Sequence, residues 1–203
     1  MPAALSWSAV AVADHADALF EAERALAGRF VPRRMRTFAS GRLAARRALA
    51  AAGCPPAAIL MQPDGAPAAP EGWRLSISHT DETAVAVACR SGAAGGVGID
   101  VEQIARMDPA LRHYVVGPLD RVPGDADAER LTATFSLRES LFKAVPGVDP
   151  QALYVRWDGD AVDCGVEGEA LALSYGWSAV DGHIVSYCVA LFPGGGMKGR
   201  APR

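Results

Sequence analysis

The chain has 203 residues, of which 50% are hydrophobic and 21% are charged, the balance of a folded soluble protein that forms one ordinary domain or two small, closely packed halves. The net charge of −3 gives no general nucleic-acid signature. No stretch approaches the ~18 apolar residues that a membrane-spanning helix needs. Neither a nucleic-acid-binding protein nor a membrane-spanning protein is therefore expected.

The N-terminal third predicts one strand and two helices. Apolar and polar residues alternate over residues 5–12, which is typical of a half-buried strand, and residues 19–27 have helical spacing. A longer helix is expected over 32–52, because Pro32 suits the first position of a helix and Gly53 suits its end. A connector rich in proline, alanine and glycine follows.

The middle of the chain predicts a group of strands and then a helix. Three strand candidates lie at residues 73–78, 83–90 and 97–102. The short gaps between them indicate antiparallel pairing. Residues 108–118 are weakly helical, and a helix over 126–145 is expected with Asp125 as its N-cap and Pro146-Gly147 as its end.

The C-terminal part predicts further strands, at residues 152–157, 169–175, 177–180 and 183–191. Asp181-Gly182 between the last two is a strong hairpin signal. The tail from Pro193 is rich in glycine and is expected to be flexible. Strands and helices in this order predict an α+β fold.

The cysteines and the N-terminus indicate a cytoplasmic protein. The four cysteines show no paired metal-ligand or redox spacing, so they are interpreted as reduced thiols: Cys54, Cys89, Cys164 and Cys188. The first residues lack a basic leader, and a signal peptide is therefore not expected.

Two segments carry a pattern with chemical meaning. Asp100 and Glu102 alternate with apolar residues in a predicted strand, so both emerge on one side, roughly 6–7 Å apart. Glu139 and Lys143 lie four residues apart in a predicted helix and share one face. Three carboxylates and an ammonium suit a divalent cation held against a phosphate-bearing substrate. The alternative is a solvated strand face and an exposed helical ion pair.

Arginines are concentrated near the N-terminus. Eight of them lie between Arg24 and Arg47, and no acid occurs between Glu23 and Asp64, which suits an anionic ligand. Arg34 and Arg42 are eight residues apart and therefore lie close to one helical face, two turns apart.

Four segments in this order resemble the Sfp-type 4′-phosphopantetheinyl transferases, most closely the enterobactin-synthase subgroup found with siderophore synthesis. They are Gly41-Arg42-Leu43-Ala44-Ala45-Arg46, Ser76-Ile77-Ser78-His79-Thr80, Gly98-Ile99-Asp100-Val101-Glu102 and Phe135-Ser136-Leu137-Arg138-Glu139-Ser140-Leu141-Phe142-Lys143-Ala144. The resemblance implies two similar α+β halves related by pseudo-two-fold symmetry, with an active site between them. The halves would be residues 1–104 and 105–192, followed by a tail at 193–203.

The resemblance also implies an activity: 4′-phosphopantetheine is transferred from coenzyme A to a serine of an apo acyl or peptidyl carrier protein, and adenosine 3′,5′-bisphosphate is released. Mg²⁺, with Mn²⁺ as a substitute, would be held by Asp100, Glu102 and Glu139. By the same resemblance Glu139 would be the general base, and Lys143 would neutralise the pyrophosphate.

Phosphate contacts are implied for four more residues. Ser78 would contact the phosphates, and His79, Arg42 and, less securely matched, Arg34 would bind the 3′-phosphate of coenzyme A. The loop at 61–67 contains no basic residue, where the family often has a lysine or arginine, so one coenzyme contact is either missing or supplied from elsewhere.

The carriers expected from this resemblance belong to siderophore, non-ribosomal peptide or polyketide synthesis, and the enzyme is expected to be a monomer. Two other functions remain open from the sequence. One is a magnesium-dependent nucleotide pyrophosphohydrolase, and the other is a non-catalytic protein that binds coenzyme A or a carrier.

Overall fold

The structure is a computed structural model that describes residues 5–92 and 94–191. Its strands are β1 (Ser6–Ala11), β2 (Trp73–His79), β3 (Thr83–Arg90), β4 (Gly96–Gln103), β5 (Leu153–Asp158), β6 (Ala161–Val166), β7 (Ala172–Val180) and β8 (His183–Leu191). Its α-helices are α1 (Glu21–Ala27), α2 (Pro32–Ala51), α3 (Arg112–Val115) and α4 (Ala128–Ala144). Short 3₁₀ turns lie at Ala16–Ala18, Ile104–Arg106, Pro109–Leu111 and Pro150–Ala152.

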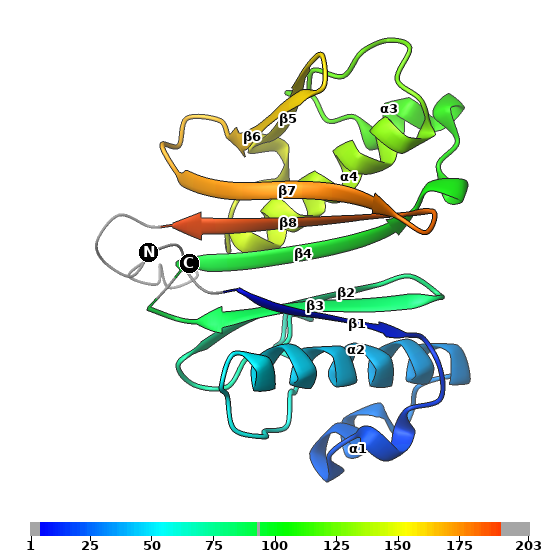
Figure 1. The fold of residues 1–203 in the computed structure, drawn as a ribbon, viewed down its shortest axis with the longest axis vertical. Coiled ribbons are helices and arrows are strands. Elements are labelled where there is room, and N and C mark those ends of the chain that lie inside the picture. Colours follow the sequence, from blue (N-terminus) through cyan, green and yellow to red (C-terminus); the bar gives the residue numbers. More distant parts are fainter. Residues whose placement is uncertain (1–4, 93, 192–203) are drawn as a thin grey trace.

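Two three-stranded antiparallel sheets form the body of the molecule (Figure 1). The first has the order β1-β3-β2 and the second the order β4-β8-β7, while β5 and β6 form a separate hairpin. Each sheet is covered on one face by a long helix: α2 packs on the first sheet and α4 on the second. This arrangement confirms the predicted α+β fold with two similar halves.

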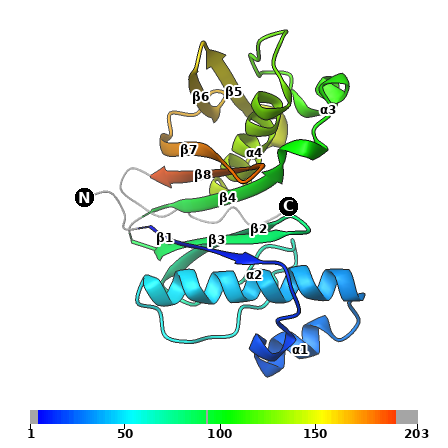
Figure 2. The same cartoon turned by 45° about the vertical axis from the view of Figure 1, so that its right-hand side comes forward.

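The two sheets turn their remaining faces toward each other. Alternate residues of β3, Val85, Val87 and Cys89, pack against Ile99 and Val101 of β4 in an apolar layer between the halves. Since side chains alternate across a strand, the other residues of β3 face α2. The order of layers is therefore α2, first sheet, second sheet and α4, as the turned view also shows (Figure 2).

The edge strands β2 and β4 lie side by side where the sheets meet, but they are not joined by a backbone ladder. Instead, the backbone N–H of Ile99 donates to the Ser76 hydroxyl over 3.1 Å. The predicted antiparallel pairing of β4 with its neighbours in sequence is therefore wrong, because β4 pairs along its whole length with β8. The sequence analysis placed the boundary between the two halves after residue 104, which assigns β4 to the N-terminal half. This division of the chain stays a prediction.

Three other details differ from the expectations. A single strand, β7, replaces the two predicted at 169–175 and 177–180, because Gly176 pairs with Tyr187 of β8 and continues the ladder without a break. Strand β6 was not predicted, since Asp163 and Gly165 are unfavourable in strands. The N-cap of α4 is Asp127, which accepts from the Arg130 N–H, and not Asp125.

Other expectations agree with the structure. Helix α2 begins at Pro32, and Gly53 adopts a φ of +87° directly after its end. Asp181 and Gly182 have φ values of +48° and +75°, as a tight hairpin turn requires. The expected flexible tail lies outside the described residues. No helix in the described part of the chain is long and apolar enough to cross a membrane.

Candidate functional site

The site begins with a close approach between β4 and α4. A Cβ atom added to Gly98 would lie 1.8 Å from the backbone oxygen of Ser140, so only glycine lets the helix pack this closely. Because alternate residues of a strand share a face, Asp100 and Glu102 lie on the same side of β4 as Gly98. Glu139 and Lys143 flank Ser140 on the helix, and the two predicted segments therefore meet.

Lys143 joins three elements from both halves. Its ammonium donates to the Asp100 carboxylate over 2.7 Å, to the Ser78 hydroxyl over 3.2 Å and to the Ile99 carbonyl over 3.2 Å. Ser78 in turn donates to the same Asp100 oxygen over 2.8 Å. The alternative interpretation of the sequence was an exposed ion pair between Glu139 and Lys143 along the helix, but among the described residues the ion pair of Lys143 is with Asp100.

Asp100 is deeply buried, with 3% of its side chain exposed. One of its oxygens, Oδ1, accepts both bonds, and the other, Oδ2, is buried with no hydrogen-bond partner among the described residues. A buried carboxylate oxygen without a partner is costly, so this atom is suited to a cation or another donor.

The carboxyl groups of Glu102 and Glu139 lie near Asp100, so acidic groups outnumber the single lysine at this site. Burial, and then the negative charge of Asp100, raise the pKa of Glu102 to about 7. Burial also raises the pKa of Glu139, against the opposing effect of Lys143. Each of the three acids contributes to or feels the electrostatic field of the others, while a single lysine lies among them.

The carboxyl groups of Asp100, Glu102 and Glu139 are chemically suited to bind a hard divalent cation, because Mg²⁺ prefers carboxylate oxygens as ligands. Within residues 5–92 and 94–191, however, no three acidic, histidine or cysteine side chains are already gathered at ligating distances. The Lys143 ammonium balances Asp100 in this arrangement.

At the C-terminal end of β2, His79 faces α2. Its Nε2 lies 3.1 Å from Nη1 of Arg34, and its Nδ1 lies 3.3 Å from the Thr80 carbonyl oxygen. Both contacts are satisfied by a neutral imidazole with its proton on Nδ1. Burial lowers the pKa of His79, and the neighbouring Arg34 lowers it further. The structure thus brings His79 and Arg34 together.

Arg42 is placed differently from the expectation. It is 6% exposed, and it donates to the carbonyl oxygens of Ile59 and Leu60 over 2.6 and 3.3 Å while its guanidinium stacks on Phe38. Burial lowers the pKa of Arg42 to about 10. Its guanidinium therefore anchors the connector to α2, which leaves little of it for a phosphate.

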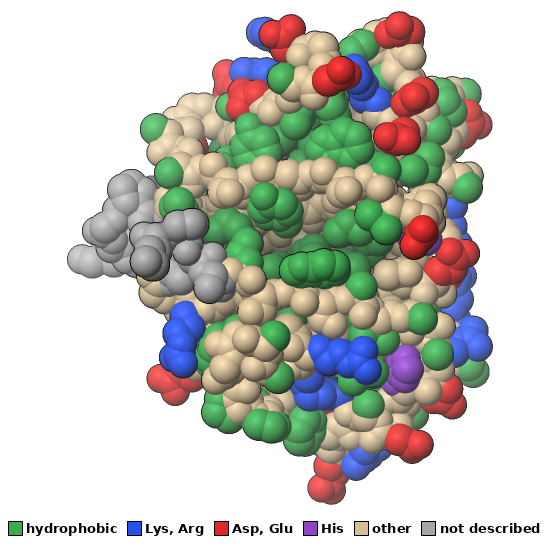
Figure 3. Space-filling model, in the orientation of Figure 1, with side chains coloured by type: hydrophobic (Ala, Val, Ile, Leu, Met, Phe, Trp, Pro, Cys, Tyr) green, Lys and Arg blue, Asp and Glu red, His purple; other side chains and the backbone are tan. Residues whose placement is uncertain are grey.

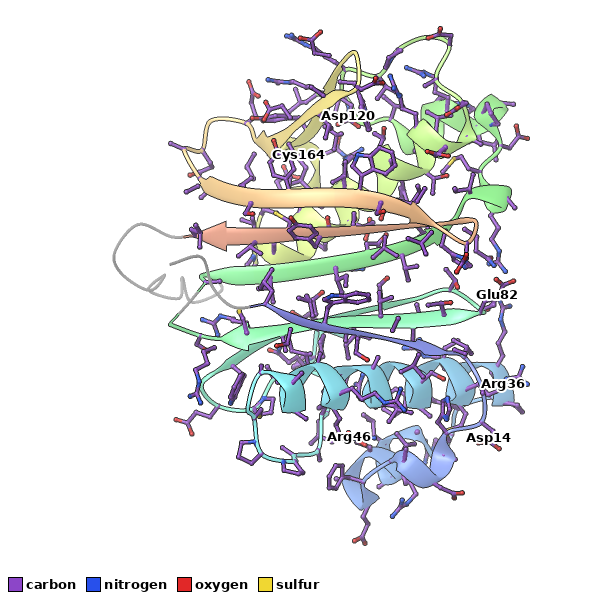
Figure 4. The ribbon with its side chains drawn as sticks, in the orientation of Figure 1. Asp14, Arg36, Arg46, Glu82, Asp120 and Cys164 are labelled. Atoms are coloured by element: carbon purple, nitrogen blue, oxygen red, sulfur yellow. The ribbon has the colours of Figure 1, made fainter. Side chains whose placement is uncertain are left out.

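A second charged group stands near the His79 end of the sheet. Asp81 accepts from Arg33 of α2 and from Arg106, which follows β4, so one acid links the two halves. These two arginines lower the pKa of Asp81. Glu82 of the same turn and Arg36 of α2 lie at this end of the molecule (Figure 4).

A cavity of about 1050 Å³ opens at the other end of β2, between the halves. Its walls come from the loop at 62–69, from β2 between Trp73 and Ile77, from the segment that leads into β4 and its first two residues, and from the end of α4. Its charged lining residues are Asp64, Arg74, Glu139 and Lys143. In Figure 1 the start of β4 and the end of β8 mark this end, on the left.

Two residues of this region had no role in the sequence analysis. Ser76 binds the β4 backbone, and Arg74 enters the cavity wall with its Nε donating to the Gly95 carbonyl over 3.2 Å. The sequence analysis treated Arg74 as part of an ordinary strand. Its role could have been predicted only from the alternation of the strand, which puts Arg74 on the same face as Ser76 and Ser78.

Three comparisons with known proteins bear on the site. Residues 22–89 match the family described as the 4′-phosphopantetheinyl transferase N-terminal domain, a segment that includes Arg34, Arg42, Ser78 and His79. The chain is 37% identical over 140 residues to the 4′-phosphopantetheinyl transferase Svp of Streptomyces mobaraensis. This similarity covers 64% of the chain and 56% of that protein, so the chain spans little more than half the length of this relative.

Two solved structures show weaker similarity. The holo-[acyl-carrier-protein] synthase of Thermotoga maritima has a TM-score of 0.37 at 18% identity, over 48% of this chain and 64% of that one. The synthase of Bacillus anthracis in complex with CoA (3′,5′-ADP) has a TM-score of 0.38 at 19% identity, over 48% and 96%. Residues 22–89 are thus similar to the N-terminal domain of the 4′-phosphopantetheinyl transferases, and the chain is similar over part of its length to one transferase of that name.

Proposed function

We propose that this protein transfers 4′-phosphopantetheine from coenzyme A to a serine of an apo carrier protein. The observation that carries the proposal is the cluster of Ser78, Asp100 and Lys143, which joins both halves and whose Lys143 lines a cavity large enough for a coenzyme. The similarity to a named transferase supports the same activity.

In this proposal the pyrophosphate lies beside Lys143. The Lys143 ammonium acts as a compact positive charge that stabilises the negative charge growing on the leaving phosphate. The Ser78 hydroxyl, which contacts the Lys143 ammonium, orients the phosphate oxygens. Arg34 and His79 remain the proposed ligands of the 3′-phosphate, and Arg42 supports them by holding the connector against α2.

Glu139 is the proposed general base. Its raised pKa makes its carboxylate a better proton acceptor than an ordinary glutamate. The serine hydroxyl proton passes to Glu139 as the serine oxygen attacks phosphorus, and the bond to adenosine 3′,5′-bisphosphate breaks. The two halves supply orientation, which accounts for most of the rate gain in a reaction of this type.

Asp100, Glu102 and Glu139 are the proposed ligands of Mg²⁺. The buried Oδ2 of Asp100, which has no hydrogen-bond partner among the described residues, supports this assignment. When bound, the ion supplies positive charge to the pyrophosphate oxygens. Carriers of siderophore, non-ribosomal peptide or polyketide synthesis, the enterobactin-type subgroup and a monomeric cytoplasmic enzyme belong to the same proposal. The four cysteines are free and buried, in agreement with a reducing compartment.

The test is to incubate the protein with coenzyme A, MgCl₂ and a panel of apo carrier domains, and to measure the carrier mass. The expected result is a mass increase equal to one phosphopantetheine, which disappears in EDTA and in Glu139→Gln. If every carrier stays unmodified, the proposal is wrong. Release of phosphopantetheine without any carrier would identify a pyrophosphohydrolase instead.

A further inference from the structure

The Lys143 ammonium is fully engaged by the protein itself. An ammonium group has three N–H donors, and here they have three acceptors: the Asp100 carboxylate at 2.7 Å, the Ser78 hydroxyl at 3.2 Å and the Ile99 carbonyl at 3.2 Å. These acceptors lie on β2 and β4, so the ammonium is held between the two halves. A phosphate oxygen can therefore accept a hydrogen bond from this ammonium only if one of the three contacts is given up.

The Asp100 carboxylate depends on the same contact. Its Oδ1 accepts from both Lys143 and Ser78, while its buried Oδ2 has no hydrogen-bond partner among the described residues. A buried carboxylate needs a positive charge beside it, and the Lys143 ammonium supplies one. A divalent cation on this carboxylate would meet the repulsion of the ammonium at close range, where salt screens little. Lysine and cation therefore compete for Asp100.

The two partners of this ion pair differ in their access to a ligand. The Asp100 side chain is 3% exposed, whereas the Lys143 side chain is 27% exposed. Lys143 lines the cavity of about 1050 Å³, and Asp100 is not among the described residues that line it. An anionic ligand in the cavity therefore contacts the lysine directly. It can draw the ammonium away from Asp100 without entering the layer in which Asp100 is buried.

We propose that the Lys143 ammonium occupies Asp100 in place of a divalent cation until the pyrophosphate of the coenzyme draws it away, so that coenzyme and cation bind cooperatively. This inference rests on the proposed function. While the lysine is on Asp100, the apparent affinity for a cation is reduced by the fraction of molecules in which the carboxylate is free. Because coupling between two ligands is reciprocal, the cation tightens coenzyme binding by the same factor, typically about 5–150-fold.

The first experiment titrates wild type and Lys143→Met with Mn²⁺ in the absence of coenzyme, and measures free Mn²⁺ by electron paramagnetic resonance. Methionine keeps most of the length of the side chain and removes the ammonium, so Asp100 becomes free for the cation. The dissociation constant for Mn²⁺ should fall by about fivefold or more, the lower limit for coupled sites. An equal or larger dissociation constant in Lys143→Met would overturn the proposal.

Arg106→Gln is the matched control for the loss of a positive charge. Arg106 also acts on the charge of Glu102, but its ion pair is with Asp81 and not with Asp100. It is an exposed side chain whose field is screened, so its removal should change the dissociation constant for Mn²⁺ by about twofold or less. A gain as large as that of Lys143→Met would show a general effect of charge and would overturn the proposal.

The second experiment repeats the titrations with saturating coenzyme A, corrected for Mn²⁺ bound by coenzyme A alone. The ratio of the dissociation constants without and with coenzyme A is the coupling factor. Contacts between pyrophosphate and cation contribute to this factor in both proteins, whereas release of the ammonium contributes only in wild type. The factor should be smaller in Lys143→Met by about fivefold or more. An unchanged factor, with coenzyme A bound more weakly both with and without Mn²⁺, would limit Lys143 to the pyrophosphate and overturn the proposal.

A measurement that keeps Lys143 covers the case in which Lys143→Met does not fold. The chain has two lysines, Lys143 and Lys198, so in Lys198→Arg with ¹³C- and ¹⁵N-labelled lysine the NMR signal of the ammonium belongs to Lys143. With its three acceptors in place, the ammonium should exchange its protons slowly in EDTA. Saturation with Mg²⁺ alone should make this exchange rapid. Binding of Mg²⁺ in calorimetry with the ammonium signal unchanged would overturn the proposal.

Failure of the proposed function is recognised separately. In that case wild type transfers no arm to any carrier in the mass assay. The titrations need no carrier, so they still decide whether lysine and cation compete for Asp100. If neither wild type nor Lys143→Met binds Mn²⁺, with or without coenzyme A, the inference is overturned whatever the transfer assay gives.

Discussion

Gly98 is the residue at which packing and chemistry are most closely coupled. In Gly98→Ala, the new Cβ would start 1.8 Å from the Ser140 oxygen and 2.8 Å from its carbonyl carbon, where a separation of at least 3.0 Å is needed. Both contact atoms belong to the backbone of α4, so no side-chain rotation relieves the collision. The helix and β4 must move apart.

The cost can be estimated from overpacked cores, where extra methyl groups destabilise by 1–3 kcal/mol. Since a helix backbone must shift, we expect about 3 kcal/mol, which lowers Tm by roughly 6–12 °C in a chain of this size. The movement also separates the Lys143 ammonium from Asp100, now at 2.7 Å. Arm transfer should therefore fall together with stability.

Urea denaturation and the transfer assay measure both effects. Gly124→Ala is the matched control, because its added Cβ would meet nothing within 4 Å and its φ is not positive. It should stay within about 0.5 kcal/mol of wild type. A free energy of unfolding for Gly98→Ala equal to that of the control would refute the close approach of α4.

Three more predictions concern the charged groups. Lys143→Met leaves Asp100 buried without its cation and should cost about 3 kcal/mol in EDTA, the low end for buried pairs because 27% of the lysine side chain is exposed. The double variant with Asp100→Asn should lose clearly less than the sum of the single changes, and additive losses in urea would contradict the pairing. Glu102 has its folded-state pKa raised from 4.5 to about 7, so the folded protein binds its proton more tightly and stability falls as pH rises from about 4.5 to 7. Glu102→Gln should therefore gain on the order of 1 kcal/mol over wild type at pH 8 and nothing at pH 4, a discounted figure for a partly exposed group, measured by urea midpoints in EDTA. Arg42→Met leaves two connector carbonyls without their donor and should cost about 2–4 kcal/mol, with faster hydrogen exchange in the connector. Normal stability with lost coenzyme binding would instead make Arg42 a direct phosphate ligand.

The surface adds a feature that the linear pattern does not contain. On the face shown in Figure 3, hydrophobic side chains gather along the middle, where the two halves meet, and most charged side chains lie around the rim, at the top, along the right side and at the bottom. Trp7 of β1 is 66% exposed, although its strand was interpreted as half-buried. Exposure at the margin of the layer between the sheets depends on how those sheets meet, and no single strand specifies that.

Local chemistry was sufficient to predict most elements. Pro32 and Gly53 bound α2 because proline suits a first turn and glycine a positive φ, and Asp181-Gly182 closes a hairpin for the same conformational reason. The partners of β4 could not be predicted, since β8 lies some eighty residues further along the chain. Pairing over that distance depends on the whole fold, and short gaps in sequence were a misleading guide.

The site divides in the same way. The sequence alone determined that Asp100, Glu102, Glu139 and Lys143 would stand on two matching faces, because strand and helix periods dictate which side chains share a side. Only the tertiary structure decided that Lys143 neutralises Asp100, that Arg42 is used up by the connector, and that Arg74 enters a cavity. Those outcomes depend on contacts between the halves, and hydrogen bonding and burial across such a junction are properties of the packed chain and not of any one segment.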